Sequence, residues 1–191
     1  FENDQGLGLY RRSYQEPESG GLGLDESGGA ARSSVSLDDL LLEALFVHNR
    51  GRYGEAIRIY TAILASAPPK EVKAVLHKHR GMAYFSESLY DQAIADFDLA
   101  LEYDPRCYKA AYFRGVVRSV QEDYGSALLD YDLSLSINPF QAYTHYRRAQ
   151  VYWHLGDYPK VVADCDSTLR IEPEHPQATK LRHLAQARLE D

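Results

Sequence analysis

The sequence predicts an all-α fold, a solenoid of stacked antiparallel helix pairs. From Leu37 onward, apolar residues recur at three- and four-residue steps, as an amphipathic helix requires. The stretch YDQAIADFDLALEYDP, which begins at Tyr90, returns at equal intervals as YGSALLDYDLSLSINP at Tyr124 and more loosely as YPKVVADCDSTLRIEP at Tyr158. This interval is the period of a helical repeat array, whose unit of about 34 residues consists of two helices.

Two further markers move in register with this period. Prolines close the units at Pro68, Pro105, Pro139 and Pro173, and only the first interval is longer than the period, by three residues. Small residues repeat the same intervals at Ala44, Gly81, Gly115 and Ala149. These markers predict repeats at about 37–69, 74–106, 108–140 and 142–174, with three extra residues in the Pro68–Pro69–Lys70 turn. A last amphipathic helix, about 175–190, should cap the array.

The four units resemble the tetratricopeptide repeat, whose pattern joins a small residue, an aromatic, a Gly-x-Tyr turn, Ala-x-x-x-aromatic and a closing proline. Repeat two carries the pattern at Gly81, Tyr84, Tyr90, Ala93, Phe97, Ala100 and Pro105. Repeat three departs from it at Arg118, where the first aromatic is expected, and repeat four at Val161 and Cys165. The resemblance covers roughly residues 36–190. It implies a right-handed superhelix whose first helices line a concave groove that binds proteins or peptides.

Composition narrows the classes of partner. The chain has 191 residues, 45% of them hydrophobic, and a net charge of −7, which argues against nucleic-acid binding because phosphate contacts need a basic excess. No run of about 18 apolar residues occurs, so no membrane insertion is expected. Two cysteines are too few for a disulfide framework, and we expect a reducing, cytoplasmic setting. Residues 1–35 are rich in Gly, Ser and Glu and are predicted to be a flexible tail.

Charged residues recur with the repeat and predict structural ion pairs. A D-x-D sequence stands at Asp96/Asp98, Asp130/Asp132 and Asp164/Asp166, and arginines stand at Arg80, Arg114 and Arg148. Residues two apart on a helix point about 200° apart, so the two carboxylates of one pair cannot share a metal ion. We therefore expect each arginine to pair with aspartates across antiparallel helices, in partly exposed pairs worth about 0–1 kcal/mol each.

Nothing in the sequence predicts catalysis or a cofactor. The histidines of His77–His79 fail as a metal site by the same geometry. Cys107 stands at a helix start with no paired base, and Cys165 replaces a core aromatic. We therefore expect neither an enzyme nor a bound metal.

The inward-facing positions of the first helices define the candidate site. They combine aromatic rings with cations, at Lys78, Met82, Phe85, Lys109, Tyr112, Tyr143, Tyr146, Arg147, Gln150 and Trp153. Such a strip suits a protein partner that offers a peptide segment with acidic and apolar side chains. Chaperone-binding members of the family that the chain resembles use a carboxylate clamp, but its positions here hold Leu41, Leu45, His79, Lys109 and Phe113, and only Lys109 matches.

An alternative is a structural scaffold. The first helix of repeat one places Leu41, Leu42, Leu45 and Phe46 over a wide arc, where only part is needed for stacking. Either the tail, with GLGL at residues 6–9 and 21–24, or a second subunit in a homodimer then covers this surface, or it forms an apolar end of the groove.

Overall fold

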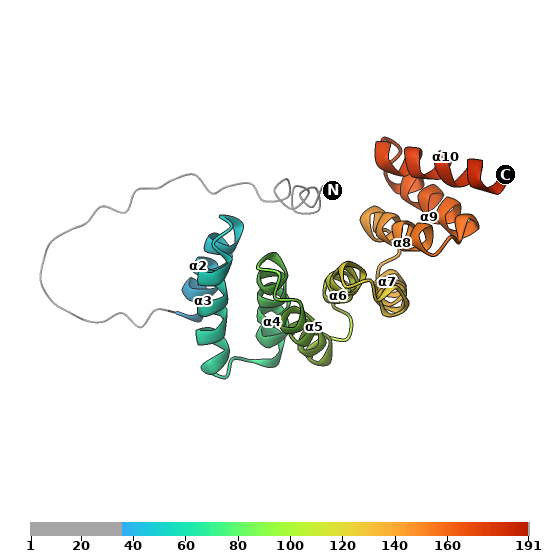
Figure 1. The fold of residues 1–191 in the computed structure, drawn as a ribbon. Helices are drawn as coiled ribbons and strands as arrows, with labels where there is room; N and C mark the ends of the chain where they lie inside the picture. The colour runs from blue at the N-terminus through green and yellow to red at the C-terminus, as the bar shows by residue number, and fades with distance from the viewer. Residues whose placement is uncertain (1–35, 191) are drawn as a thin grey trace, which may run out of the picture.

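The computed structural model describes residues 36–190, and within that range it forms nine helices and no strand (Figure 1). The predicted tail at 1–35 lies outside the described residues. The helices are α2 (Leu37–Asn49), α3 (Tyr53–Ala65), α4 (Lys70–Ser86), α5 (Tyr90–Tyr103), α6 (Tyr108–Val120), α7 (Tyr124–Ile137), α8 (Ala142–His154), α9 (Tyr158–Ile171) and α10 (Pro176–Glu190). Each even-numbered helix from α2 to α8 packs on the helix that follows it, and α10 packs on α9.

Turns and caps set the helix boundaries. Ser36 begins α2 with a capping box, since its hydroxyl accepts a hydrogen bond from Asp39 N and the Asp39 carboxylate accepts one from Ser36 N. The turn between the two helices of each repeat holds one residue at positive φ, Gly51, Ser88, Glu122 or Gly156. The equivalent positions thus share one backbone shape although only two carry the glycine that favours it.

The turns between repeats do not use Asp104 and Asn138 as N-caps, although the sequence favours that role. Asp–Pro and Asn–Pro pairs look like N-caps followed by a first-turn proline. In the structure, Asp104 and Asn138 instead end α5 and α7, and their side chains accept hydrogen bonds from Arg106 N and Phe140 N, each two residues on. These side chains organise turns between repeats, so they cannot cap α6 and α8.

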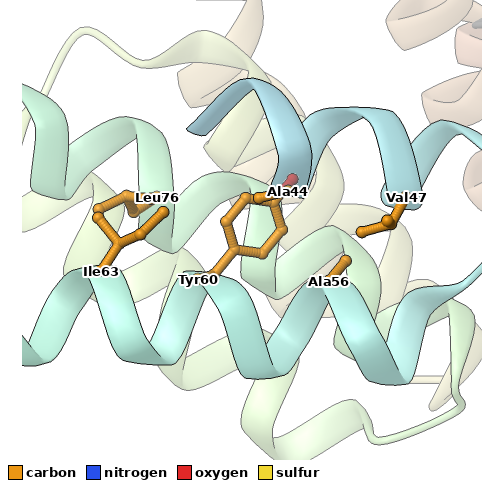
Figure 2. Close-up of a cluster of buried hydrophobic side chains, with 6 residues drawn as sticks. All are labelled: Ala44, Val47, Ala56, Tyr60, Ile63 and Leu76. Carbon is orange, nitrogen blue, oxygen red and sulfur yellow. The ribbon is translucent and has the colours of Figure 1, made fainter. Parts of the chain in front are cut away.

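The core lies between the helices of each pair, where small residues admit rings. A Cβ added at Gly81 would lie 2.8 Å from the Phe97 ring, and one at Gly115 would lie 2.9 Å from the Tyr131 ring. Both rings are fully buried, so they have no room to give way. Figure 2 shows the matching arrangement in repeat one, with the Tyr60 ring from α3 beside Ala44 of α2, and Ile63 facing Leu76 of α4.

The three extra residues of repeat one extend a helix. The turn after α3 stays short, and α4 begins at Lys70, earlier than the position near 74 expected for repeat two. With 17 residues, α4 is longer than the other first helices, which have 13 each. Over residues 36–190, no helix is both long and apolar enough to cross a bilayer.

Candidate functional site

The first helices of neighbouring repeats contact one another. Besides packing within their own pairs, α4 contacts α6 and α6 contacts α8. Ring contacts also join the helices, His48 of α2 to His79 of α4 at 6.1 Å and Tyr112 of α6 to Tyr143 of α8 at 4.7 Å between centroids. Side chains on these helices therefore lie in one strip that runs along the array.

The N-terminal part of this strip is a cluster of lysine and histidine side chains. Burial lowers the pKa of Lys78, and the nearby ammonium of Lys109 lowers it further, against the opposing charges of Cys107 and Asp104. Burial also holds the pKa of His79 well below its usual value, with Lys78, His48 and Lys109 adding to the effect. The shifts show that these groups lie close together and partly shielded from water.

The middle of the strip presents an arginine between polar partners. Arg147 donates a hydrogen bond from Nη1 to Gln150 Oε1 at 3.2 Å. Burial raises the pKa of Tyr112, and a hydrogen bond with Arg147 partly offsets that rise. Because Tyr112 also meets Tyr143 edge to face, α6 and α8 together hold the guanidinium in place.

The C-terminal part is aromatic. The Tyr146 ring lies 4.8 Å from the ring of His175, which stands just before α10. Burial raises the pKa of Tyr146, while Arg147 and a hydrogen bond with Gln150 oppose the rise. This end of the strip therefore reaches the capping helix.

Three predicted site residues have packing roles. Met82 is only 6% exposed and belongs to the core of repeat two, so it does not lie on an open surface. Phe85 packs against the cores of repeats two and three and lies 6.1 Å from the Tyr90 ring. Trp153 packs against the core of repeat four and meets Tyr158 edge to face. The other seven predicted residues are half-buried side chains on α4, α6 and α8.

Three positions of the carboxylate clamp are filled with packed side chains. Leu41 packs against the core of repeat one, His79 stacks on Tyr60 with centroids 6.2 Å apart, and Phe113 stacks on Phe97 at 6.1 Å. The clamp chemistry is therefore replaced by ring stacking at two of its positions.

The predicted ion pairs are confirmed and form a ladder along the array. Arg80, Arg114 and Arg148 each bind the first aspartate of the D-x-D in their own repeat, sixteen residues later. Arg114 and Arg148 also bind the second aspartate of the preceding repeat, sixteen residues earlier, at Asp98 and Asp132. We call this set the arginine–aspartate ladder.

Sequence reasoning missed the ends of the ladder. Arg182 of α10 binds Asp166 at 3.0 Å, and its position one repeat period after Arg148 was the available signal. At the other end, Arg80 donates to the hydroxyl of Thr61, which stands where an aspartate would. The capping helix is thus bound to repeat four by the same kind of arginine–aspartate ion pair that joins neighbouring repeats.

The ladder also explains the departure at Arg118. In repeats two and four, His77 and His145 place Nδ1 2.8 Å and 3.2 Å from the buried aspartate. Repeat three has Ala111 at the equivalent position, and there Arg118 donates from Nη1 to Asp130 at 2.8 Å. Arg118 therefore supplies the hydrogen bond that a histidine supplies elsewhere.

The ladder is more buried than the sequence indicated. Asp96, Asp130 and Asp164 are 3%, 2% and 3% exposed, which corrects the expectation of partly exposed pairs for the first aspartate of each D-x-D. The pairs of the second aspartates, Asp98, Asp132 and Asp166, are partly exposed as expected. Burial would raise the pKa of Asp164, but hydrogen bonds from Arg148 and His145 outweigh it and hold that pKa below its usual value. Loss of one partner would leave a buried charge uncompensated, which costs far more than loss of a surface pair.

Two observations on the described residues concern metal binding and thiol reactivity. Residues 36–190 contain no group of three or more His, Cys, Asp or Glu side chains that could hold a metal ion. Cys165 is fully buried, and burial raises the pKa of its thiol to about 12, so it serves packing as predicted.

Comparison with known proteins identifies the repeat. The family model of the tetratricopeptide repeat matches residues 79–142. Protein unc-45 homolog B from Xenopus laevis is 37% identical over 62 residues, which are 32% of this chain but only 7% of that protein.

Solved structures share the fold over most of this chain. MamA from Desulfovibrio magneticus RS-1 superposes with a TM-score of 0.72 at 18% identity, over 81% of this chain and 86% of that one. The first tetratricopeptide domain of Spaghetti (RPAP3), solved with the HSP90 peptide SRMEEVD, superposes with a TM-score of 0.61 at 22% identity, over 63% of this chain and 96% of that one. At these identities the likeness concerns the fold. The family match shows that residues 79–142 consist of tetratricopeptide repeats, and the helix pairs on either side of that stretch continue the same repeat fold.

Proposed function

We propose that this chain is a non-catalytic protein-interaction module that binds an acidic peptide segment along the inner face of α4, α6 and α8. The observation that carries the proposal is the cationic character of this face on a chain with a net charge of −7. Lys78, Lys109 and Arg147 supply the charge, and Tyr112, Tyr143 and Tyr146 supply rings between and beside them.

The electrostatics favour a carboxylate ligand. The pKa of Lys78 is lowered chiefly by burial and further by the nearby Lys109, so this cation stands where water solvates it poorly. A carboxylate near both ammonium groups would relieve their repulsion and replace the lost solvation. Arg147, already oriented by Gln150 and Tyr112, would add a charge-assisted hydrogen bond with little further loss of side-chain entropy.

The similar RPAP3 domain is described as bound to the peptide SRMEEVD, which carries three acidic side chains, and this supports an acidic ligand for the fold. Since four of the five clamp positions here hold stacked or apolar side chains and only Lys109 matches, we infer a different manner of recognition. The acidic side chains of an internal segment would meet the cations, and its apolar side chains would lie on the tyrosines.

Selection from a random peptide library tests the proposal. The full chain should enrich peptides rich in Asp and Glu, and the Lys109→Glu/Arg147→Glu variant should bind the enriched peptides at least about tenfold more weakly by fluorescence anisotropy. The matched control is Arg58→Glu/Arg170→Glu, which makes the same charge change at exposed positions of α3 and α9 and should leave affinity within about twofold. Enrichment of neutral or basic peptides, or equal loss in both variants, would contradict the proposal.

A further inference from the structure

The first helix of the array exposes a face that every later repeat covers. Phe46 of α2 is 53% exposed, although Arg50 lies over its ring with the guanidinium carbon 4.3 Å from the centroid. The equivalent positions in α4, α6, α8 and α10 are Ala83, Val117, Val151 and Ala185, all at most 1% exposed. These positions face the second helix of the preceding repeat, so we call this side of α2 its stacking face. Figure 1 shows α2 at the N-terminal end of the array.

Leu42 marks the place where the preceding repeat normally supplies an aromatic ring. It is 65% exposed, and its equivalents are the rings of His79 and Phe113 in repeats two and three and Arg147 in repeat four. His79 stacks on Tyr60, and Phe113 stacks on Phe97, which lie on α3 and α5. A partner that completes the stacking face should therefore place an aromatic against Leu42.

Glu43 indicates the charge of the missing partner. Its equivalents in the later repeats are the ladder arginines. From repeat three onward, each of these arginines binds an aspartate on the second helix of the preceding repeat. That aspartate directly follows the position of the buried ring, as Asp98, which Arg114 binds, follows Phe97. In α2 the sign is reversed, because an acid occupies the arginine position. The complement is an aromatic followed at once by a cation.

Residues 6–13 of this chain have that sequence. They read GLGLYRRS, beside AIADFDLA at 93–100 and ALLDYDLS at 127–134 in α5 and α7. All three segments place a small residue first, an aliphatic residue second, an aromatic fifth, a charged residue sixth and a small residue last. The sixth residue has the opposite charge, since Arg11 stands where the others have an aspartate. The segment also differs at its fourth and seventh positions, where Leu9 and Arg12 replace an aspartate and a leucine.

We propose that residues 6–13 dock on the stacking face of α2, in the place that a preceding second helix would occupy, with Tyr10 against Leu42 and Phe46 and with Arg11 facing Glu43. The connection is long enough, because the 23 residues of 14–36 span up to roughly 75 Å and α2 is only about 20 Å long. Tethering gives an effective concentration on the order of 1 mM, so a contact of modest intrinsic affinity suffices. This surface lies on α2, whereas the proposed function uses α4, α6 and α8.

Hydrogen exchange on the full 191-residue chain tests the docking. In the wild type, amides of residues 7–14 should exchange at least about tenfold more slowly than in a free peptide of the same sequence. Leu42→Asp should abolish this protection, whereas Leu129→Asp, at a leucine that is 70% exposed on α7, should leave it unchanged. Arg11→Glu should weaken the protection without altering the folded domain, and Arg11→Glu/Glu43→Arg should restore it.

The mass in solution identifies the occupant. A monomer that retains protection on dilution supports docking within one chain. Free exchange of residues 7–14, or protection that survives Leu42→Asp, overturns the proposal. A dimer whose protection is lost on dilution also overturns it, because the stacking face is then covered by a second copy.

Discussion

At the scale of the single residue, His48 is unusual because its ring is buried among aromatic neighbours. The rings of Tyr53, Tyr60 and His79 lie within 6.2 Å of it, centroid to centroid, and Nδ1 makes no hydrogen bond. Burial lowers the pKa of His48 to about 4. The native state therefore holds this histidine neutral over a pH range in which the unfolded chain protonates it.

This shift predicts acid-sensitive stability. Below pH 6.5 the unfolded chain gains a proton at His48 that the native state gains only near pH 4, so this stability is present above pH 6.5 and is lost as the pH falls toward 4. The free energy of unfolding in urea should drop by about 2 kcal/mol from His48 alone between about pH 7 and about pH 5. His48→Phe should shrink the drop and His183→Phe, at an exposed position of α10, should not. A pH dependence unchanged by His48→Phe would refute the assignment.

At the scale of the helix, each D-x-D uses its two carboxylates differently. The first faces inward and ties α5, α7 or α9 to the first helix of its own repeat, and the second faces outward and ties that helix to the next repeat. The side chains of Asp130 and Asp132 are 2% and 53% exposed. One helix thus offers a buried and an exposed ion pair two residues apart.

Replacement of the two aspartates of α7 should lower the free energy of unfolding by very different amounts. Asp130→Asn leaves Arg114 and Arg118 partly buried beside a neutral amide, so we expect a loss of about 3 kcal/mol in the free energy of unfolding. Asp132→Asn removes a pair that water screens, with an expected loss of at most about 1 kcal/mol. Urea unfolding at neutral pH followed by circular dichroism measures both. Equal losses would show that burial does not set the strength of the ladder.

At the scale of the whole molecule, the array depends on neighbour contacts, and α10 serves as the last neighbour. Leu181 and Ala185 of α10 pack against the core of repeat four, which includes Cys165. In a solenoid each unit contacts only the adjacent ones, so loss of the last helix should be felt mainly in repeat four.

Removal of α10 should therefore expose one thiol. In a Cys107→Ser background, a chain ending at His175 should react with a thiol reagent at least about tenfold faster than the full-length chain, since Cys165 would lose its cover. The helical signal per residue should change little, because repeats one to three keep their contacts. A thiol that stays protected would show that α10 is dispensable for the packing of repeat four.

Repetition explains how much of this could be predicted. A periodic sequence reports the same environment several times, so the small residues facing rings and the arginines facing aspartates were readable from spacing alone. The repeat spacing also predicted the helix pairs and the packing role of Cys165. Single departures were harder to interpret, and Arg118 became intelligible only beside Ala111 and Asp130.

The sequence by itself determined the array of helix pairs and the side-chain pairs that stabilise it, because both depend on spacing along the chain. The tertiary structure alone decided how deeply each side chain is buried, since that depends on atoms from neighbouring repeats. It placed Met82 in the core, buried Asp96, Asp130 and Asp164, turned Asp104 and Asn138 into turn residues and left Leu42 and Phe46 uncovered. Depth of burial has no local sequence signature of its own, since Asp130 and Asp132 belong to one D-x-D and yet are 2% and 53% exposed.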